Sequence, residues 1–227
     1  MDNKIIILTL PLLVLSAFFS NSFASQENST LDSQGNYANP SLGISFQAPQ
    51  GWTVQEPSKS QPGAPEIAVI APYSGGFTAS ISFNIENANG TSLDDYVKDK
   101  KNQLEANNQS GDIMMLSEQN DTIGGFFAEI SILEENFTTQ KGSSIIEFKQ
   151  TTVLANDKFY MITYANDKNS FDNNLSDYDT LLKSIKFTND ASSLFDYAPI
   201  SIAAGALILA AVIVIKRKRR VGSTRRT

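Results

Sequence analysis

Residues 198–215 form an uncharged, strongly apolar run that ends directly before five basic residues, Lys216, Arg217, Lys218, Arg219 and Arg220. About 18 or more apolar residues are enough to cross a bilayer as a helix, and a basic cluster at one end marks the cytoplasmic side. A helix that is apolar all round belongs in lipid. The sequence therefore predicts a transmembrane helix at 198–215, a basic cytoplasmic tail at 216–227, and the lipid bilayer as a partner.

The beginning of the chain has the pattern of a secretory signal. Lys4 precedes an apolar stretch at 5–19, and Ser22-Phe23-Ala24 supplies the small residues that a signal peptidase reads. We predict a signal peptide at 1–24 and a single-pass type I membrane protein whose N-terminal domain is extracytoplasmic. The alternative is an uncleaved N-terminal anchor, which the shortness of the stretch and Pro11 disfavour.

Charge separates into two regions of opposite sign. Residues 25–196 hold 10 Lys and Arg against 23 Asp and Glu, a net charge of about −13, whereas the tail at 216–227 is basic. A domain this acidic lacks the basic surface that nucleic acids require, so we expect no nucleic-acid partner. The chain has no cysteine, so packing alone has to hold the exported domain together.

The extracytoplasmic part divides into a flexible polar lead-in at 25–36, a domain at 37–188 and a short polar stalk at 189–197. A region of this length is large enough for one self-sufficient core. Six sequons on this side predict surface acceptor sites for glycans if the host glycosylates exported proteins. They begin at Asn28, Asn89, Asn108, Asn120, Asn136 and Asn174.

Alternation of apolar and polar side chains with period two predicts half-buried strands in the domain. The clearest run is 77–85, and further strands are expected at 44–48, 66–71, 126–132, 145–154 and 159–165. Asn156 and Asp157 join the last two runs. Because Asn and Asp tolerate the positive φ angles of tight turns, we expect a hairpin there.

Two segments have helical periodicity. Ser92 begins a capping-box-like start, and an apolar face follows in Leu93, Tyr96, Val97 and Leu104. The second begins at Ser170, and its apolar face comprises Phe171, Leu175, Tyr178, Leu182 and Ile185. Strands with two helices and short connections predict an α+β domain, an antiparallel β-sheet covered by helices.

Short motifs stand at both ends of the domain. The opening has Tyr37, Gly43-Ile44-Ser45-Phe46, Pro49 and Gly51-Trp52, and the closing part has Phe159-Tyr160-Met161-Ile162-Thr163-Tyr164 and Ser184-Ile185-Lys186-Phe187. In this order they resemble the PsbP-like domain family (PsbP/Mog1 fold). The resemblance implies an α-β-α sandwich. The family includes extrinsic, non-enzymatic subunits at the lumenal side of photosystem II, and exported prokaryotic relatives.

This chain departs from the plant members of that family. It has no histidine, its lead-in carries Glu27 and Asp32 instead of a basic arm, and it has its own predicted membrane helix. The resemblance therefore implies the fold and not the photosynthetic role. The combination resembles the membrane-anchored PsbP-like proteins of archaea.

The lack of histidine and cysteine excludes several kinds of active site. No Ser-His-Asp or Cys-His nucleophile and no usual zinc site can be built. A hydrolase of envelope glycans needs only two carboxyl groups at a set separation, so that mechanism stays open. Carboxyl groups are abundant here and point to nothing specific. We expect a protein that is not an enzyme and has no catalytic residue.

A weak calcium site is the alternative with residues to name. Asp172, Asn174, Asp177 and Asp179 place oxygen ligands near alternate positions, as a calcium loop does. However, Asp177 stands where that loop requires glycine, and Lys183 stands where it requires a bidentate Glu. The start of a helix, where Asp is stabilising, explains the same residues.

We therefore expect a membrane-anchored accessory module that binds or assembles a membrane or envelope protein complex. Trp52 is expected to anchor the first hairpin to the core. Residues 55–65 are rich in Pro, Ser and Gln and predict a mobile loop, which we expect to be the contact surface. Weak Ca²⁺ binding is the alternative function.

Overall fold

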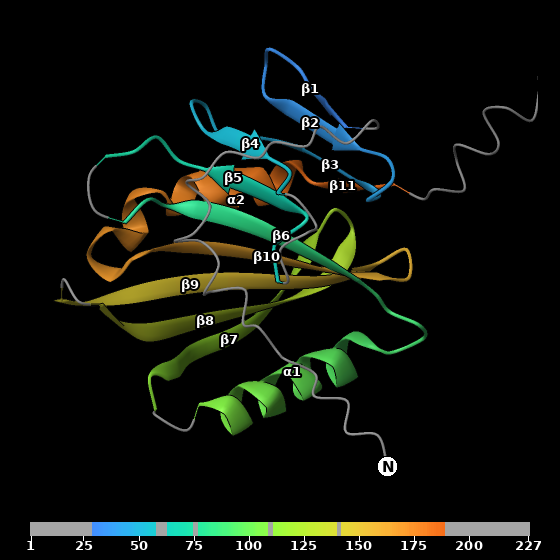
Figure 1. Ribbon diagram of the computed structural model, residues 1–227. Coiled ribbons are helices and arrows are strands. Elements are labelled where there is room, and N and C mark those ends of the chain that lie inside the picture. The colour runs from blue at the N-terminus through green and yellow to red at the C-terminus, as the bar shows by residue number, and fades with distance from the viewer. Residues whose placement is uncertain (1–28, 58–62, 75–76, 109–110, 140–141, 189–227) are drawn as a thin grey trace, which may run out of the picture. The chain divides into compact units, whose positions relative to one another are not determined.

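A seven-stranded antiparallel sheet organises the domain (Figure 1). The computed structural model describes residues 29–57, 63–74, 77–108, 111–139 and 142–188. The strand order is β4 (Thr53–Gln55), β5 (Ile67–Ile70), β6 (Ser80–Asn87), β10 (Lys158–Asp167), β9 (Gly142–Ala155), β8 (Phe126–Thr139) and β7 (Ile113–Ile123). β7 is thus an outer strand, and its ladder partner is β8.

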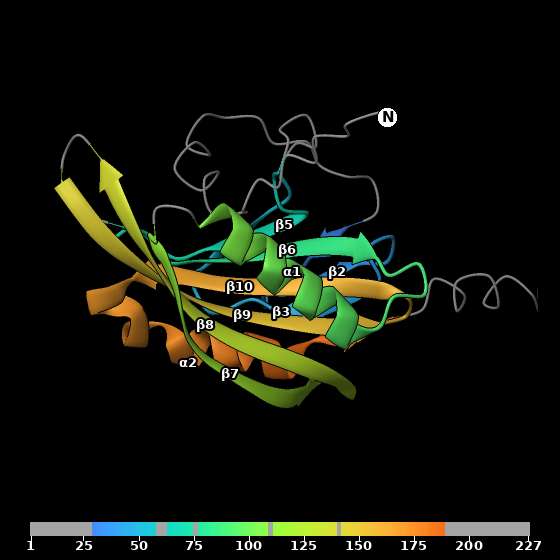
Figure 2. The same ribbon diagram turned by 90° about the horizontal axis from the view of Figure 1, so that it is seen from below.

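A smaller sheet is made from the two ends of the domain. Its order is β1 (Thr30–Leu31), β2 (Asn36–Asn39), β3 (Ile44–Gln47) and β11 (Lys186–Phe187). The helical segments are α1 (Leu93–Asn107), the 3-10 helix η2 (Lys168–Asn173) and α2 (Leu175–Ser184). Figure 2 shows α1 and α2 on opposite sides of the large sheet, so the expected sheet covered by helices is confirmed.

Apolar side chains gather on both faces of the large sheet. The main core lies between this sheet and a layer formed by α2 and the small sheet, where Phe46 of β3 stacks on Phe83 of β6 with ring centroids 4.8 Å apart. On the other face Tyr96 of α1 stacks on Phe159 of β10 at 3.8 Å. Trp52 belongs to the main core, as expected.

The first helix forms as its sequence predicts. Ser92 is the N-cap residue, and its hydroxyl accepts a hydrogen bond from the Asp95 N–H. Leu93 and Tyr96 are buried against the sheet, while Asp94 and Asp95 lie in the first turn, where negative charge is stabilising.

Two tight turns fix the register of the long strands. Asn156 and Asp157 have φ angles of 53° and 59° and join β9 to β10, which confirms the expected hairpin. Gly124 and Gly125 have φ angles of 57° and 87° and join β7 to β8. Both turns place two residues with positive φ between paired strands, the geometry that suits the twist of an antiparallel ribbon.

The structure corrects three expectations. The polar lead-in is not free of structure, because Thr30 and Leu31 pair with β2 and Asp32 caps the turn through hydrogen bonds to the backbone of residues 34 and 36. The helix expected from Ser170 begins as the 3-10 helix η2, and the α-helix starts only at Leu175. The strands also form a second, four-stranded sheet in addition to the expected one.

Candidate functional site

The segment for which a calcium loop was the alternative to a helix start is helical. Asp172 lies in η2, Asn174 joins η2 to α2, and Asp177 lies in the first turn of α2. Asp179 forms an ion pair with Lys149 of β9, with 2.8 Å between oxygen and nitrogen. A calcium loop needs converging oxygens, whereas residues two apart on a helix do not face each other.

No ready-made metal site stands out in the described part of the chain. Within it, no group of three or more His, Cys, Asp or Glu residues is arranged to hold a metal ion. Calcium binding stays a prediction, and ligands would have to leave helical positions to provide it.

Buried hydroxyl groups hold the η2–α2 segment on the sheet. The Tyr178 hydroxyl donates to the Ile162 carbonyl (3.0 Å) and shares a hydrogen bond with the Thr151 hydroxyl (2.7 Å). The Tyr164 hydroxyl donates to the Phe171 carbonyl at 2.7 Å. Burial raises the pKa of Tyr164 to about 12. These contacts give the segment a structural role.

Two carboxyl groups face each other across β8 and β9. Glu134 and Glu147 are directly paired in register, and like charges in this position are destabilising. Lys168 of η2 forms an ion pair with Glu134. Burial, and then the neighbouring Glu134, raises the pKa of Glu147. A glycosidase also needs two carboxyl groups, but here Lys168 is paired with one of the two.

The loop expected to be the contact surface is anchored at its first residues. Glu56 accepts hydrogen bonds from the Tyr37 hydroxyl and the Asn39 amide of β2. Burial, and then Glu56, raises the pKa of Tyr37. Residues 58–62 lie outside the described part, so the contact role of this loop stays a prediction.

The sequons occupy different environments. Asn89, Asn120 and Asn136 are exposed, in a turn, on β7 and on β8. Asn108 is half-buried, and its amide exchanges two hydrogen bonds with the backbone of Ile113. Asn174 is partly exposed at the start of α2, and Asn28 lies outside the described residues.

The outer strand β7 was not predicted. Its sequence does not alternate with period two, and all but three of its residues are exposed. Met114 and Leu116 are 54% and 44% exposed. The run Ile113-Met114-Met115-Leu116 was the available signal, since a short apolar run bounded by glycine and polar residues is consistent with a strand. The outer edge of the large sheet thus carries exposed apolar side chains.

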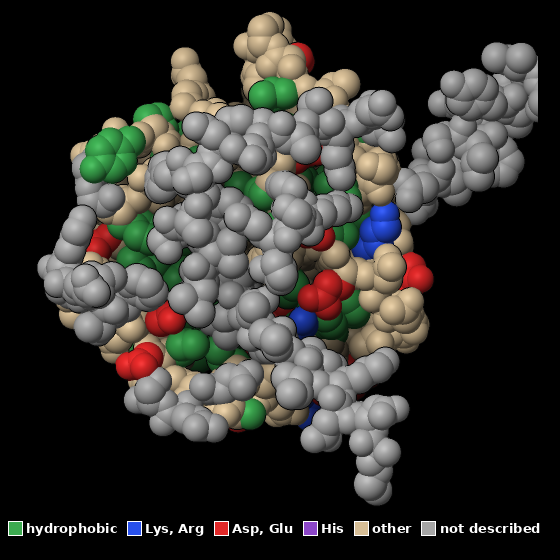
Figure 3. All heavy atoms as spheres, in the orientation of Figure 1, with side chains coloured by type: hydrophobic (Ala, Val, Ile, Leu, Met, Phe, Trp, Pro, Cys, Tyr) green, Lys and Arg blue, Asp and Glu red, His purple; other side chains and the backbone are tan. Residues whose placement is uncertain are grey.

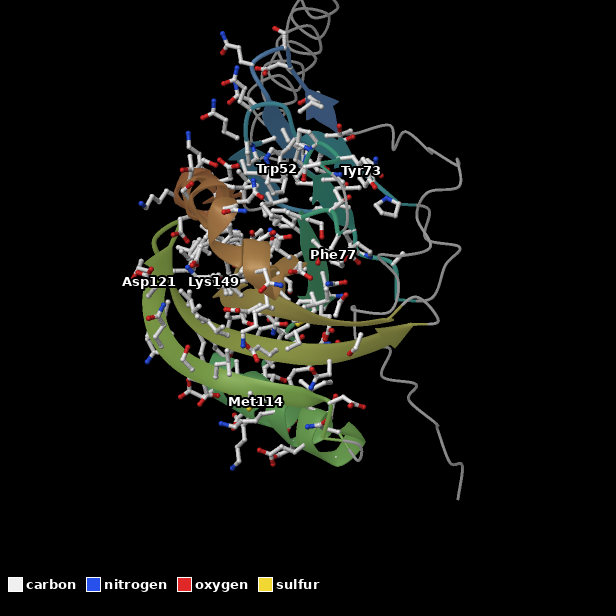
Figure 4. The ribbon with its side chains drawn as sticks, turned by 90° about the vertical axis from the view of Figure 1, so that its left-hand side faces the viewer. Trp52, Tyr73, Phe77, Met114, Asp121 and Lys149 are labelled. Atoms are coloured by element: carbon white, nitrogen blue, oxygen red, sulfur yellow. The ribbon has the colours of Figure 1, made fainter. Side chains whose placement is uncertain are left out.

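The side chains of the outer strand lie apart from the aromatic side chains near the small sheet. Figure 4 shows Met114 and Asp121 on the outer strand, well apart from Trp52 and Tyr73 near the small sheet. Figure 3 shows acidic side chains scattered over the visible described surface instead of gathered in one cleft. A single acidic site is therefore not apparent on that face.

The predicted signal peptide at 1–24, the stalk, the membrane helix at 198–215 and the basic residues from Lys216 to Arg220 all lie outside the described residues. Among the helices that the structure describes, none is long and apolar enough to cross a bilayer.

Comparison with known proteins gives a fold and no assigned role. No protein-family model and no curated protein matches the chain. The solution structure of cyanobacterial PsbP (CyanoP) from Synechocystis sp. PCC 6803 is similar, with a TM-score of 0.50 and 13% identity over 75% of this chain and 98% of that chain.

Two further solved structures are similar at lower scores. LpqN of Mycobacterium tuberculosis, involved in cell envelope biogenesis, has a TM-score of 0.48 and 11% identity over 72% of this chain and 91% of that chain. The Ran-binding protein Mog1p of Saccharomyces cerevisiae has a TM-score of 0.43 and 11% identity over 75% of this chain and 98% of that chain. At such identities a likeness shows fold alone, and the described domain has the PsbP/Mog1-like fold.

Proposed function

We propose that this protein is a non-catalytic binding module, anchored in the membrane by residues 198–215, whose extracytoplasmic domain docks to a membrane or envelope protein. The location rests on the signal-like beginning and on the apolar run followed by basic residues. The binding role rests on the surface of the domain.

One observation carries the proposal. β7 is an outer strand that presents Met114 and Leu116 to solvent. Natural proteins usually protect such edges, because exposed apolar edge strands invite pairing with another chain. Methionine side chains adapt to varied partners and are common on binding surfaces. Two exposed apolar side chains on an outer strand of an acidic domain therefore favour a docking role.

Other features of the chain support binding over catalysis. The sequence has neither His nor Cys. Of the directly opposed acids Glu134 and Glu147, Glu134 forms an ion pair with Lys168. The fold likeness to CyanoP supports the same class of function, since the family resemblance implies non-enzymatic accessory subunits.

The test is chemical cross-linking of the full chain in native membranes, followed by affinity purification and quantitative mass spectrometry. The full chain is compared with a variant carrying Met114→Ser and Leu116→Ser. The matched control is Leu31→Ser, which changes an apolar side chain of similar exposure (53%) on β1. We expect one saturable partner whose recovery falls at least fivefold in the β7 variant and changes little in the control.

Two results would count against the proposal. Failure to recover any partner that saturates as the full chain increases would remove the docking role. Equal loss of the partner in the β7 variant and in the Leu31→Ser control would show that the β7 side chains make no specific contact.

A further inference from the structure

The backbone of β7 has alternate positions that face away from the sheet. The Gly124-Gly125 turn makes Ile123 and Phe126 the hydrogen-bonded pair that closes the hairpin. In an antiparallel ladder hydrogen-bonded and non-hydrogen-bonded pairs alternate. The N–H and C=O groups of Thr122, Asn120 and Glu118 therefore point outward.

The same alternation holds beyond a bulge. The register shifts between Met115 and Ser117, and at the start of the strand the Asn136 N–H donates to the Asp112 carbonyl (2.9 Å). This bond makes Asp112 an inward position, so Ile113 and Met115 face outward. The outward positions thus run along the whole strand.

Side chains already cover both ends of this outer edge. The Ile113 N–H donates to the Asn108 Oδ1 at 3.0 Å, and the Asn108 amide donates to the Ile113 carbonyl. At the other end the Thr122 N–H donates to the Asp121 Oδ1 at 2.7 Å. The contact of Thr122 agrees with the outward direction derived from the turn, and that of Ile113 agrees with the direction derived from the Asn136–Asp112 bond.

Between these covered ends lies an open stretch of backbone. Considering contacts with described residues, we find no hydrogen bond to the outward groups of Met115, Glu118 and Asn120. Unpaired N–H and C=O groups in a row are a template for an additional strand.

The charges beside this stretch define what kind of strand fits. Glu118 forms an ion pair with Lys101 of α1 at 3.0 Å. Burial raises the pKa of Glu129, and the charges of Glu118 and Asp94 raise it further. Glu129 is paired in register with Asn120, so it lies beside the open backbone, where the charges of Glu118 and Asp94 repel its carboxylate and Lys101 attracts it. An incoming basic side chain would relieve this repulsion.

A second copy of the chain fits poorly for the same reason. Antiparallel pairing of two β7 strands would bring the carboxyl groups around Glu118 and Asp121 of both copies together, and residues 25–196 of each copy carry a net charge of about −13. Like charges placed opposite each other in a sheet are destabilising. The charge complement of this edge is a basic segment of another protein.

We propose that β7 binds an extended, basic segment of a partner protein as an eighth strand of the large sheet. Its main chain bonds to the outward groups of Met115, Glu118 and Asn120, its basic side chains face Glu118 and Glu129, and its apolar side chains lie against Met114 and Leu116. This inference rests on the proposed binding function and defines its mode.

The test uses two synthetic ten-residue peptides that alternate Val with Lys in one and Val with Glu in the other. Each is added to the full chain in lipid nanodiscs, and backbone amide hydrogen exchange is measured at residue resolution. We expect the Lys peptide to slow exchange at Met115, Glu118 and Asn120 at least tenfold at saturation. The Glu peptide should leave these amides unchanged.

Asn120→Pro is the diagnostic variant. It removes an outward N–H without removing a bond of the β7–β8 ladder, a position where an edge strand tolerates proline. We expect the Kd of the Lys peptide to rise about tenfold, which corresponds to about 1.4 kcal/mol. Asn120→Ala is the control, because it removes the side chain and the sequon but keeps the N–H, and its Kd should stay within threefold.

A second variant covers the case in which Asn120→Pro fails to fold. Glu118→Gln combined with Glu129→Gln should reduce the preference for the Lys peptide over the Glu peptide at least fivefold. A preference that survives this change would overturn the assigned contacts.

Further results would overturn the inference. One is equal binding of the Lys peptide by the wild type and Asn120→Pro, and another is protection of amides away from β7 by the peptide. A third is slow exchange at the open amides without peptide, in a chain that sediments as a dimer. A glycan found on Asn120 in the native chain would do the same, because it would occupy this edge. If the membrane partner is still recovered, the binding function stands and only strand addition fails.

Discussion

Buried tyrosine hydroxyls decide where the second helix lies. The Tyr178 side chain is fully buried, and its hydroxyl bonds to Thr151 and to the Ile162 carbonyl. Lys149 lies over the Tyr178 ring, 5.5 Å from its centroid, and also pairs with Asp179. Sequence periodicity places Tyr178 on the apolar face of the helix. It does not reveal that the hydroxyl is needed to satisfy groups inside the sheet.

Replacing Tyr178 by Phe should lower the free energy of unfolding by about 1–3 kcal/mol, because Thr151 loses a partner in a buried position. Urea denaturation of the full chain measures the change. The control is Tyr73→Phe, whose side chain is 75% exposed and for which we expect a change within about 0.5 kcal/mol. Equal effects at the two sites would refute the buried network.

The acidic residues of the η2–α2 segment make a separate prediction. Because Asp177 is held in a helical turn and Asp179 is paired with Lys149, we expect millimolar Ca²⁺ to shift the Tm of the full chain by less than about 1 °C. Mg²⁺ at the same concentration controls for ionic strength. A Ca²⁺-specific rise, lost in Asp179→Asn, would instead establish the calcium site.

The two tight hairpins differ in how their turns meet the rest of the domain. Asn156-Asp157 was readable from the sequence, because Asn and Asp favour positive φ between two β-rich runs. Gly124 and Gly125 stand directly before the strand expected at 126–132, which is typical of a turn, but the sequence does not indicate what this turn packs against. A Cβ atom at Gly124 would lie 2.9 Å from the Phe187 ring and 3.2 Å from the Ile185 carbonyl. This turn therefore packs against β11 of the small sheet.

Gly124→Ala should lower the free energy of unfolding by about 2–4 kcal/mol, through positive φ and steric overlap with Phe187. Gly125→Ala is the control, because no atom lies within 4 Å of its Cβ position, and it should cost about 1–2 kcal/mol. The urea denaturation midpoints of the two variants and the wild type measure both costs. If Phe187→Ala does not reduce the excess cost of Gly124→Ala, the overlap is not its cause.

Strands with clean alternation were predictable from the sequence, and so were the α+β class and the first helix. β6 alternates because Ile81 and Phe83 face the main core while Ser80 and Ser82 lie on the other face, whereas β10 is a nearly continuous apolar run because it is buried on both faces. β7 lacks this signal because it lies at the edge and buries little. The second sheet depends on pairing β11 with β3, which are more than a hundred residues apart, so no local pattern indicates it.

The candidate binding edge was missed for the same reason. Its outward groups follow from the hairpin turn, the bulge and the bonds of Asn108 and Asp121, which exist only in the folded chain. The sequence supplied the apolar run at 113–116 and the acidic balance of the domain. Neither alone indicates a surface.

Three carboxyl groups with raised pKa values make the stability of the molecule depend on pH. Burial is the largest cause that raises the pKa of Glu129, Glu135 and Glu147. The folded chain therefore binds protons at these groups at a higher pH than the unfolded chain does. Above the pKa values of the folded chain, these groups lower the free energy of unfolding by their full amount. This loss disappears as the pH falls below the pKa values of the unfolded chain.

These three groups should make the full chain more resistant to urea as the pH falls from 7 to 5. Replacing all three by Gln removes the titrating groups, so the difference between the urea midpoints at pH 7 and pH 5 should become smaller. The control replaces the exposed Asp99 by Asn. If the Gln variant keeps the full pH dependence of the wild type, other carboxyl groups are responsible.

The binding role itself is tested most directly by titrating the full chain against its partner in native membranes. Expression is raised stepwise, and the cross-linked partner is quantified for the wild type and for the variant with Met114→Ser and Leu116→Ser. The account predicts a saturating curve for the wild type and a curve shifted at least fivefold for the variant. Recovery that rises without saturation, identically in both chains, would contradict it.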